Sequence, residues 1–160
     1  MTTELSRPDC YNTDVNFQTP LWVCEYMASL LPCWVKTVLE PTKGQGNLVS
    51  VLGKYNVTAP DDFFLMPVGE FDAVVMNPPF TPMKKGYDIL YSCMGMADVI
   101  IALMPWLSII NSSKRTNDLQ IFGLKSVTHL PRKVFYGSRV QTCILELNRG
   151  YRWRTEFVVL

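Results

Sequence analysis

The sequence contains little that suits a metal-dependent or thiol-based catalyst. It has one histidine, His129, and five cysteines at positions 10, 24, 33, 93 and 143, without a CxxC pair. A structural zinc site needs four Cys or His ligands at short, regular spacings, so we expect no bound metal. An odd number of unpatterned cysteines is typical of free thiols in a reducing compartment, which predicts a cytoplasmic protein (in the host cytoplasm, if a phage encodes it).

Long apolar runs are also missing. The longest, residues 99–110, is interrupted by Pro105 and Ser108 and is shorter than the roughly 20 residues that cross a bilayer. The opening residues, MTTELSRPDC, lack a basic stretch followed by an apolar one, so we expect no signal peptide and no membrane association. Apolar residues make up 48% of the chain and charged residues 18%, a balance that predicts one globular domain over residues 18–160 after a polar segment, 1–17.

Charge is nearly balanced overall but is unevenly distributed. The net charge is +1; residues 1–80 have 4 Lys or Arg against 9 Asp or Glu, and residues 81–160 have 11 against 5. Such an asymmetry favours a polyanionic partner on the basic side. An ordinary solvated surface explains the charges equally well.

Apolar segments alternate with helical ones along the chain. Thr19 as N-cap and Pro20 at the first helical position predict a helix that Pro32 ends. Strands that are apolar on both faces predict an α/β fold, a Rossmann-like, mostly parallel sheet, and the final strands, without a helix between them, predict an antiparallel edge. We predict strands at 34–41, 71–77, 98–105, 126–130, 141–147 and 156–160, helices at 48–55, 87–96 and 106–110, an extended piece at 61–66 and a surface loop at 111–124.

A glycine-containing turn, EPTKGQGN at 40–47, follows the first strand. In doubly wound sheets, ligands bind beyond the carboxyl ends of the strands. Gly44 and Gly46 allow the backbone to approach a ligand closely, and Glu40 is suited to a cationic or hydroxyl-bearing group. A plain tight turn is the other interpretation of the same GxG spacing.

The stretch VVMNPPF at 74–80 ends a strand in a rigid, donor-poor tip. Pro78 and Pro79 fix two φ angles and remove two backbone donors. Asn77 adds a side-chain carbonyl, and Phe80 adds a flat ring. Acceptors beside a ring suit a planar group that carries an NH2, such as the exocyclic amine of a base, although a rigid turn with a core phenylalanine has the same sequence.

Taken together, five segments resemble the S-adenosylmethionine-dependent N6-adenine DNA methyltransferases in which the cofactor motifs come first. They are QTP with Trp22, VLEPTKGQGNL, DFF at 62–64, NPPF at 77–80, and LPRKVF at 130–135 with the following TCILEL. The resemblance covers most of residues 16–148. The tetrapeptide also occurs in some RNA and protein methyltransferases, and the Thr-Pro helix ahead of the glycine turn favours DNA adenine.

The resemblance implies a role for each matching residue. The cofactor, S-adenosyl-L-methionine, would contact Thr19, Pro20, Glu40, Pro41, Thr42, Gly44 and Gly46 with its methionine and ribose, and Asp62 and Phe63 with its adenine. The target base would be held by Asn77, Pro78, Pro79 and Phe80, with Phe135 as a second stacking partner. Lys84 and Lys85 would contact phosphate, or are simply solvated.

Two features depart from the family pattern. Only 14 residues separate Asn47 from Asp62, which predicts that the second strand–helix unit is deleted and, with it, the usual acidic ribose ligand; Asp61 is a possible substitute. No room remains for a separate target recognition domain, so we expect recognition from a partner subunit, or weak specificity. The tail RGYRWR at 149–154 contacts nucleic acid or packs as an edge. A degenerate binding module for nucleic acid or protein, and a methyltransferase acting on RNA or protein, remain alternatives.

Overall fold

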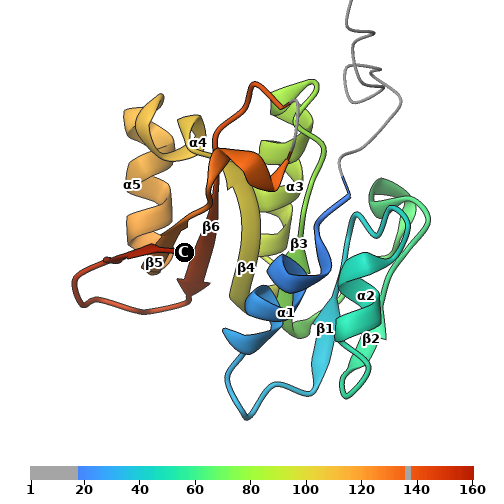
Figure 1. Ribbon diagram of the computed structural model, residues 1–160. Helices are drawn as coiled ribbons and strands as arrows, with labels where there is room; N and C mark the ends of the chain where they lie inside the picture. Colours follow the sequence, from blue (N-terminus) through green and yellow to red (C-terminus); the bar gives the residue numbers. More distant parts are fainter. Residues whose placement is uncertain (1–17, 136–137) are drawn as a thin grey trace, which may run out of the picture.

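The computed structural model describes residues 18–135 and 138–160, and its strands form one seven-stranded sheet in the order β2-β1-β3-β4-β6-β5-β7 (Figure 1). The predicted polar segment 1–17 lies outside the described residues. The strands are β1 (Thr37–Leu39), β2 (Asn56–Thr58), β3 (Phe71–Met76), β4 (Ala97–Pro105), β5 (Leu124–His129), β6 (Thr142–Asn148) and β7 (Glu156–Val159).

Strand pairing is parallel except at β6. This strand pairs antiparallel with both β4 and β5, whereas β7 adds to β5 in parallel. The predicted α/β fold is therefore confirmed, with a mostly parallel sheet and antiparallel pairing toward one edge.

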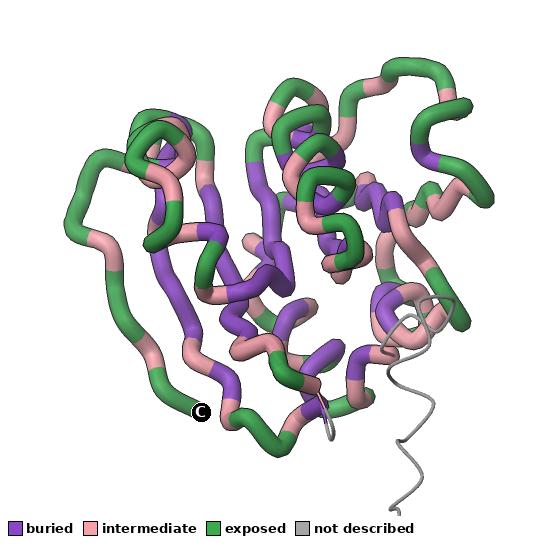
Figure 2. The backbone as a smooth tube through the Cα atoms, turned by 90° about the horizontal axis from the view of Figure 1, so that it is seen from above, coloured by how far each residue is buried: buried purple, intermediate pink, exposed green. Residues whose placement is uncertain are grey.

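Helices cover both faces of the sheet. On one face lie α1 (Leu21–Ser29) and α2 (Asn47–Val51); on the other lie α3 (Met83–Met94) and α5 (Ser113–Phe122), with the short α4 (Leu107–Ile110) after β4 (Figure 1). Successive β3 residues alternate between the two cores: Val74 and Met76 pack with α3, and Ala73 and Val75 pack with α1. The inner strands β1, β3, β4, β5 and β6 are buried along most of their length, whereas the edge strands β2 and β7 are largely exposed (Figure 2).

The predicted loop at 111–124 is wrong, because most of it is helix α5. Ser112 caps this helix by accepting a hydrogen bond from the Arg115 backbone N–H at 3.2 Å. The Arg115 guanidinium lies 3.7 Å from the centre of the Tyr87 ring on α3, and the neighbouring Tyr91 donates to Asp118 at 2.6 Å. Tertiary contacts thus stabilise a helix whose apolar periodicity is weak.

The predicted deletion of the second strand is also wrong. Residues Asn56–Thr58 form a short β2 that pairs in parallel with β1. Only one 3-10 turn, η2 (Phe63–Leu65), stands between β2 and β3, and it replaces the extended piece predicted at 61–66. Compared with the 3-2-1-4-5-6 order of a doubly wound sheet, this sheet lacks the strand outside strand two. A three-residue strand with one apolar residue, Val57, gives too little alternation to be recognised.

Among the residues that the structure describes, no helix has the length and apolar character needed to cross a membrane.

Candidate active site

The glycine turn and the NPPF tip lie side by side at the carboxyl edge of the sheet. They follow β1 and β3, which are parallel neighbours with Leu39 paired to Val74. Because parallel strands end at the same edge, residues about 35 positions apart in the sequence meet there. The two motifs to which the resemblance assigns the cofactor and the target base therefore lie next to each other.

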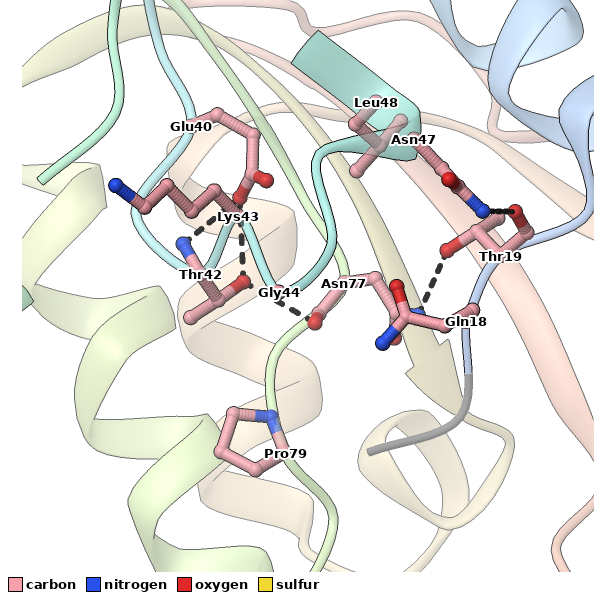
Figure 3. A pocket seen from close by; sticks show the side chains of 10 residues that line it. All are labelled: Gln18, Thr19, Glu40, Thr42, Lys43, Gly44, Asn47, Leu48, Asn77 and Pro79. Atoms are coloured by element: carbon pink, nitrogen blue, oxygen red, sulfur yellow. Dashed lines mark hydrogen bonds between the residues drawn. The ribbon is translucent and has the colours of Figure 1, made fainter. Parts of the chain in front are cut away.

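Thr42 connects the two motifs. Its backbone N–H donates to Glu40 Oε1 at 2.7 Å, and its hydroxyl donates to the backbone oxygen of Asn77 at 3.1 Å (Figure 3). The same hydroxyl lies 3.3 Å from Glu40 Oε1. The position of the Asn77 main chain is thus fixed by the turn that precedes α2.

Thr19 holds the side chain of Asn77. The Asn77 amide nitrogen donates to Thr19 Oγ1 at 2.7 Å, and Asn47 donates from its own amide to the Thr19 backbone oxygen at 3.0 Å (Figure 3). The prediction that Thr19 caps α1 is wrong: the N-cap is Pro20, without a side-chain bond. The Thr19 hydroxyl contacts the tip instead of the helix.

Glu40 is a carboxyl group in a buried position. Only 1% of the residue is exposed. Burial raises the pKa of Glu40 to about 7, against the opposing effect of the two hydrogen bonds from Thr42 and the more distant Lys43. A cation placed beside this carboxyl group would favour its ionised form.

Glycines permit close approach on both sides of the site. Gly44 and Gly46 have φ values of +50° and +89°, in the region that L side chains rarely adopt. A Cβ on Gly44 would lie 3.2 Å from the Gln18 side chain. On α3, a Cβ on Gly86 would lie 2.8 Å from the backbone oxygen of Pro79, so α3 packs directly under the tip.

An open cavity of about 370 Å³ runs along the glycine turn. A much smaller cavity adjoins it and is lined by Glu40, Asn77 and Thr19. The two share Thr42, Lys43, Gly44 and Pro79. The larger cavity is lined by these four residues and by Pro41, Pro60, Asp61, Asp62, Phe63, Phe64, Lys85 and Ile89. Most of the predicted cofactor residues therefore line these two adjoining cavities.

Other predicted residues do not line either cavity. Pro20, Gly46 and Pro78 stand just outside the lining, and Lys84 forms an ion pair with Asp88 at 2.6 Å. Phe80 packs on the hydrophobic core beneath α1, and Phe135 belongs to that core.

Four residues that line the smaller cavity were not among the predicted site residues: Gln18, Lys43, Asn47 and Leu48. Asn47 could have been recognised as a site residue from the sequence, because it is a polar residue that begins a helix directly after the glycine turn. Gln18 accepts from the Gln45 backbone N–H at 3.2 Å, a contact between distant segments that no local pattern announces.

No cluster of three or more His, Cys, Asp or Glu side chains suited to a metal occurs within the described part of the chain. Cys24, Cys93 and Cys143 are free and buried. Burial raises the pKa of both Cys93 and Cys143 to about 12, so these thiols are protonated at neutral pH and are poor nucleophiles.

Comparison with known proteins gives structural neighbours but no sequence relatives. No protein-family model matches the chain, and no curated protein matches it in sequence. A putative class I S-adenosylmethionine-dependent methyltransferase from Listeria monocytogenes matches in structure with a TM-score of 0.67 and 16% identity, over 91% of this chain and 66% of that one. The fold is that of S-adenosylmethionine-dependent methyltransferases.

Two further neighbours come from restriction–modification systems. The modification subunit of a putative type I restriction enzyme from Vibrio vulnificus matches with a TM-score of 0.71 and 15% identity, over 94% of this chain and 48% of that one. The M protein of the type I restriction enzyme EcoKI (EC 2.1.1.72) matches with a TM-score of 0.64 and 13% identity, over 86% and 45%. The chain spans about half the length of these two subunits.

Proposed function

We propose that this protein transfers a methyl group from S-adenosyl-L-methionine to the N6 amine of adenine in DNA. The observation that carries the proposal is the junction of the two motifs: Thr42 donates a hydrogen bond to the Asn77 main chain at 3.1 Å, and both residues line the smaller cavity, which adjoins the larger one along the glycine turn. The resemblance to N6-adenine methyltransferases and the fold of the restriction–modification neighbours support it.

The cofactor would lie along the glycine turn. Thr42 and Gly44 border the end of the cavity next to Asn77, where the methionine and its sulfonium belong. Asp62 and Phe63 line the other end, where the adenine of the cofactor belongs. Asp61, three residues after β2 and ion-paired with Lys43, offers a carboxylate for the ribose hydroxyls.

The chemistry is a direct transfer between two bound groups. The target adenine leaves the base stack, because its amine cannot be reached inside a duplex. The side-chain carbonyl of Asn77 and the backbone carbonyl of Pro78 accept hydrogen bonds from the NH2, which directs the nitrogen lone pair toward the sulfonium methyl. In this transfer the N–C bond would form as the S–C bond of the donor breaks, and the alkylated nitrogen would then release its proton to solvent. Catalysis is mainly positioning and electrostatic fit.

We also propose that a partner subunit supplies sequence recognition. Within residues 18–135 and 138–160, every strand belongs to one sheet. Specific reading of DNA needs an element that enters a groove and contacts base edges. The type I M proteins among the neighbours belong to multisubunit restriction systems, in keeping with this division of tasks.

A degenerate binding module is the second candidate. It is favoured by one observation: β2 has three residues and forms the sheet edge, so the cofactor side of the fold is reduced. Titration calorimetry with S-adenosylmethionine separates the two. Binding at micromolar concentration supports the enzyme, and its absence at millimolar concentration supports the module.

Analysis of the methylated product tests the reaction itself. The protein is incubated with labelled S-adenosylmethionine and unmethylated DNA, and the DNA is digested to nucleosides. We expect N6-methyladenine as the labelled nucleoside. If parallel reactions label RNA or protein and leave DNA unlabelled, the substrate is RNA or protein and not adenine in DNA.

A further inference from the structure

We infer that Thr19 is a positioning residue that orients the amide of Asn77, rather than simply a wall of the cofactor cavity. The inference rests on the proposed function, because Thr19 would act by orienting the side chain to which that function assigns the target amine. Thr19 comes from the segment before α1, whereas Asn77 follows β3, so 58 positions separate the two partners.

The amide of Asn77 needs an external partner to have a defined orientation. The terminal torsion of an asparagine side chain has a broad, roughly two-fold profile, unlike the three sharp wells of an aliphatic torsion. The bond of 2.7 Å from the Asn77 amide nitrogen to Thr19 Oγ1 supplies such a partner. With the nitrogen held there, the side-chain carbonyl oxygen, which lies in the same plane, points away from Thr19.

Thr19 is itself fixed in place. It is buried, with 4% of its surface exposed. Its backbone oxygen accepts from the Asn47 amide at 3.0 Å and from the Cys24 thiol at 3.6 Å. Asn47 is the first residue of α2, directly after the glycine turn, so the position of Thr19 is set by the same turn that borders the cofactor cavity.

The two threonines therefore act on different parts of Asn77. Thr42 binds its backbone oxygen and Thr19 binds its side-chain nitrogen. The first bond fixes where the residue sits, and the second fixes how the amide plane is turned. A displacement of about 1 Å at reacting groups lowers rates about a hundredfold, so the second bond matters even though Thr19 does not touch the base.

Replacement of Thr19 by an isosteric residue tests this role. In Thr19→Val, which keeps the shape and removes the hydroxyl, we expect kcat to fall about tenfold, because the part-buried amide of Asn77 loses the hydrogen bond that orients it. The dissociation constant for S-adenosylmethionine is expected to stay within about twofold of wild type, because the orientation of Asn77 affects the methyl-transfer step and not cofactor binding. Thr19→Ser keeps the oxygen and should restore most of the lost kcat.

Thr128 provides a matched control. It is a buried threonine on β5 whose Oγ1 lies 2.8 Å from the Tyr26 hydroxyl, outside the residues that line the two cavities. Thr128→Val should lower the melting temperature and leave kcat unchanged. Unchanged kcat in Thr19→Val, or a cofactor dissociation constant that rises tenfold at unchanged kcat, would overturn the inference.

An activity-independent measurement separates this inference from the proposed function. The side-chain amide resonances of Asn77 are identified in the ¹⁵N spectrum by their loss in Asn77→Ala. We expect slow hydrogen exchange of this amide in the wild type and exchange at least about tenfold faster in Thr19→Val, as a lost hydrogen bond predicts. If wild type methylates nothing, the proposed function fails; equal exchange in both proteins makes the inference fail.

Discussion

The two turns that meet at the candidate site are built in opposite ways. The turn after β1 uses Gly44 and Gly46 at positive φ, whereas the tip after β3 uses Pro78 and Pro79 and rests against Gly86. Glycines let a backbone adapt to a ligand, and prolines fix carbonyl acceptors in place. The difference suits the first turn to close backbone approach to a ligand and the second to rigid presentation of acceptors.

The comparison is tested most strongly by removing the acceptor of the rigid tip. In Asn77→Ala, we expect transfer to fall by a factor of about 10² to 10³ or more, the usual effect of losing one preorganised polar contact in a transition state. Cofactor affinity should remain nearly unchanged, as measured by calorimetry. Activity equal to wild type would remove Asn77 from the mechanism.

The support beneath the tip gives the next effect. In Gly86→Ala, the new Cβ would lie 2.8 Å from the Pro79 oxygen, so α3 and the tip must separate. We expect a loss of about 1–3 kcal/mol in unfolding free energy, the range for overpacking, and a fall in kcat. Gly53→Ala is the control, because nothing lies within 4 Å of its Cβ. Thermal melts and transfer assays on both variants decide the matter.

Glu40 on the glycine side gives a pH-dependent effect. Its pKa rises from 4.5 to about 7 on folding, so the folded state binds more protons than the unfolded state between these pH values. This contribution to stability is complete below pH 4.5 and disappears as the pH rises through 7. In denaturant titrations, the unfolding free energy of Glu40→Gln should no longer decline between these pH values. Glu25→Gln, at an exposed position, is the control and should keep the decline.

The same carboxyl group links pH to the cofactor. If a sulfonium or ammonium cation sits near Glu40, binding favours its ionised form and releases a proton. Affinity for S-adenosylmethionine should then rise with pH up to about 7, the raised pKa. Calorimetry in buffers of different ionisation enthalpy measures the released proton; no release in the wild type at pH 6 would place the cation elsewhere.

The smallest expected effect separates two adjacent lysines. Lys85 is an exposed residue in the first turn of α3, directly after the NPPF tip, whereas its neighbour Lys84 is paired with Asp88 at 2.6 Å. We expect Lys85→Ala to weaken DNA binding and to reduce the slope of log affinity against log salt concentration by about one, as for a lost phosphate contact. Lys84→Ala should change binding less. Equal effects of both variants would indicate a diffuse electrostatic contribution.

Sequence patterns predicted the fold class and the meeting of the two motifs, because both follow from buried parallel strands. An apolar strand such as 71–76 has to be covered by helices on both faces of the sheet. Parallel strands of this kind then end at the same edge of the sheet. Short β2 was missed because Asn56–Thr58 has a single apolar residue. Helix α5 was missed because it depends on Tyr87 and Tyr91 of α3.

Within the candidate site, residue types were easier to predict than partners. Asn77 and Gly44 are recognisable from their motifs. The bond from Asn77 to Thr19 spans two distant segments, and local sequence instead favours Thr19 as a helix cap. Side chains with hydroxyls have several feasible partners, and only the tertiary arrangement selects one.

The exposed border formed by β2 affects how tightly a nucleotide would be gripped. Among the described residues, β2 has three residues and is the outermost strand of its edge of the sheet. The adenosine end of the cavity is lined by the segment that follows it, where Phe64 is 54% exposed. The demethylated cofactor would dissociate quickly from such a binding site. Product inhibition by S-adenosylhomocysteine should accordingly be weak, and turnover should be limited by the target base and not by the spent donor.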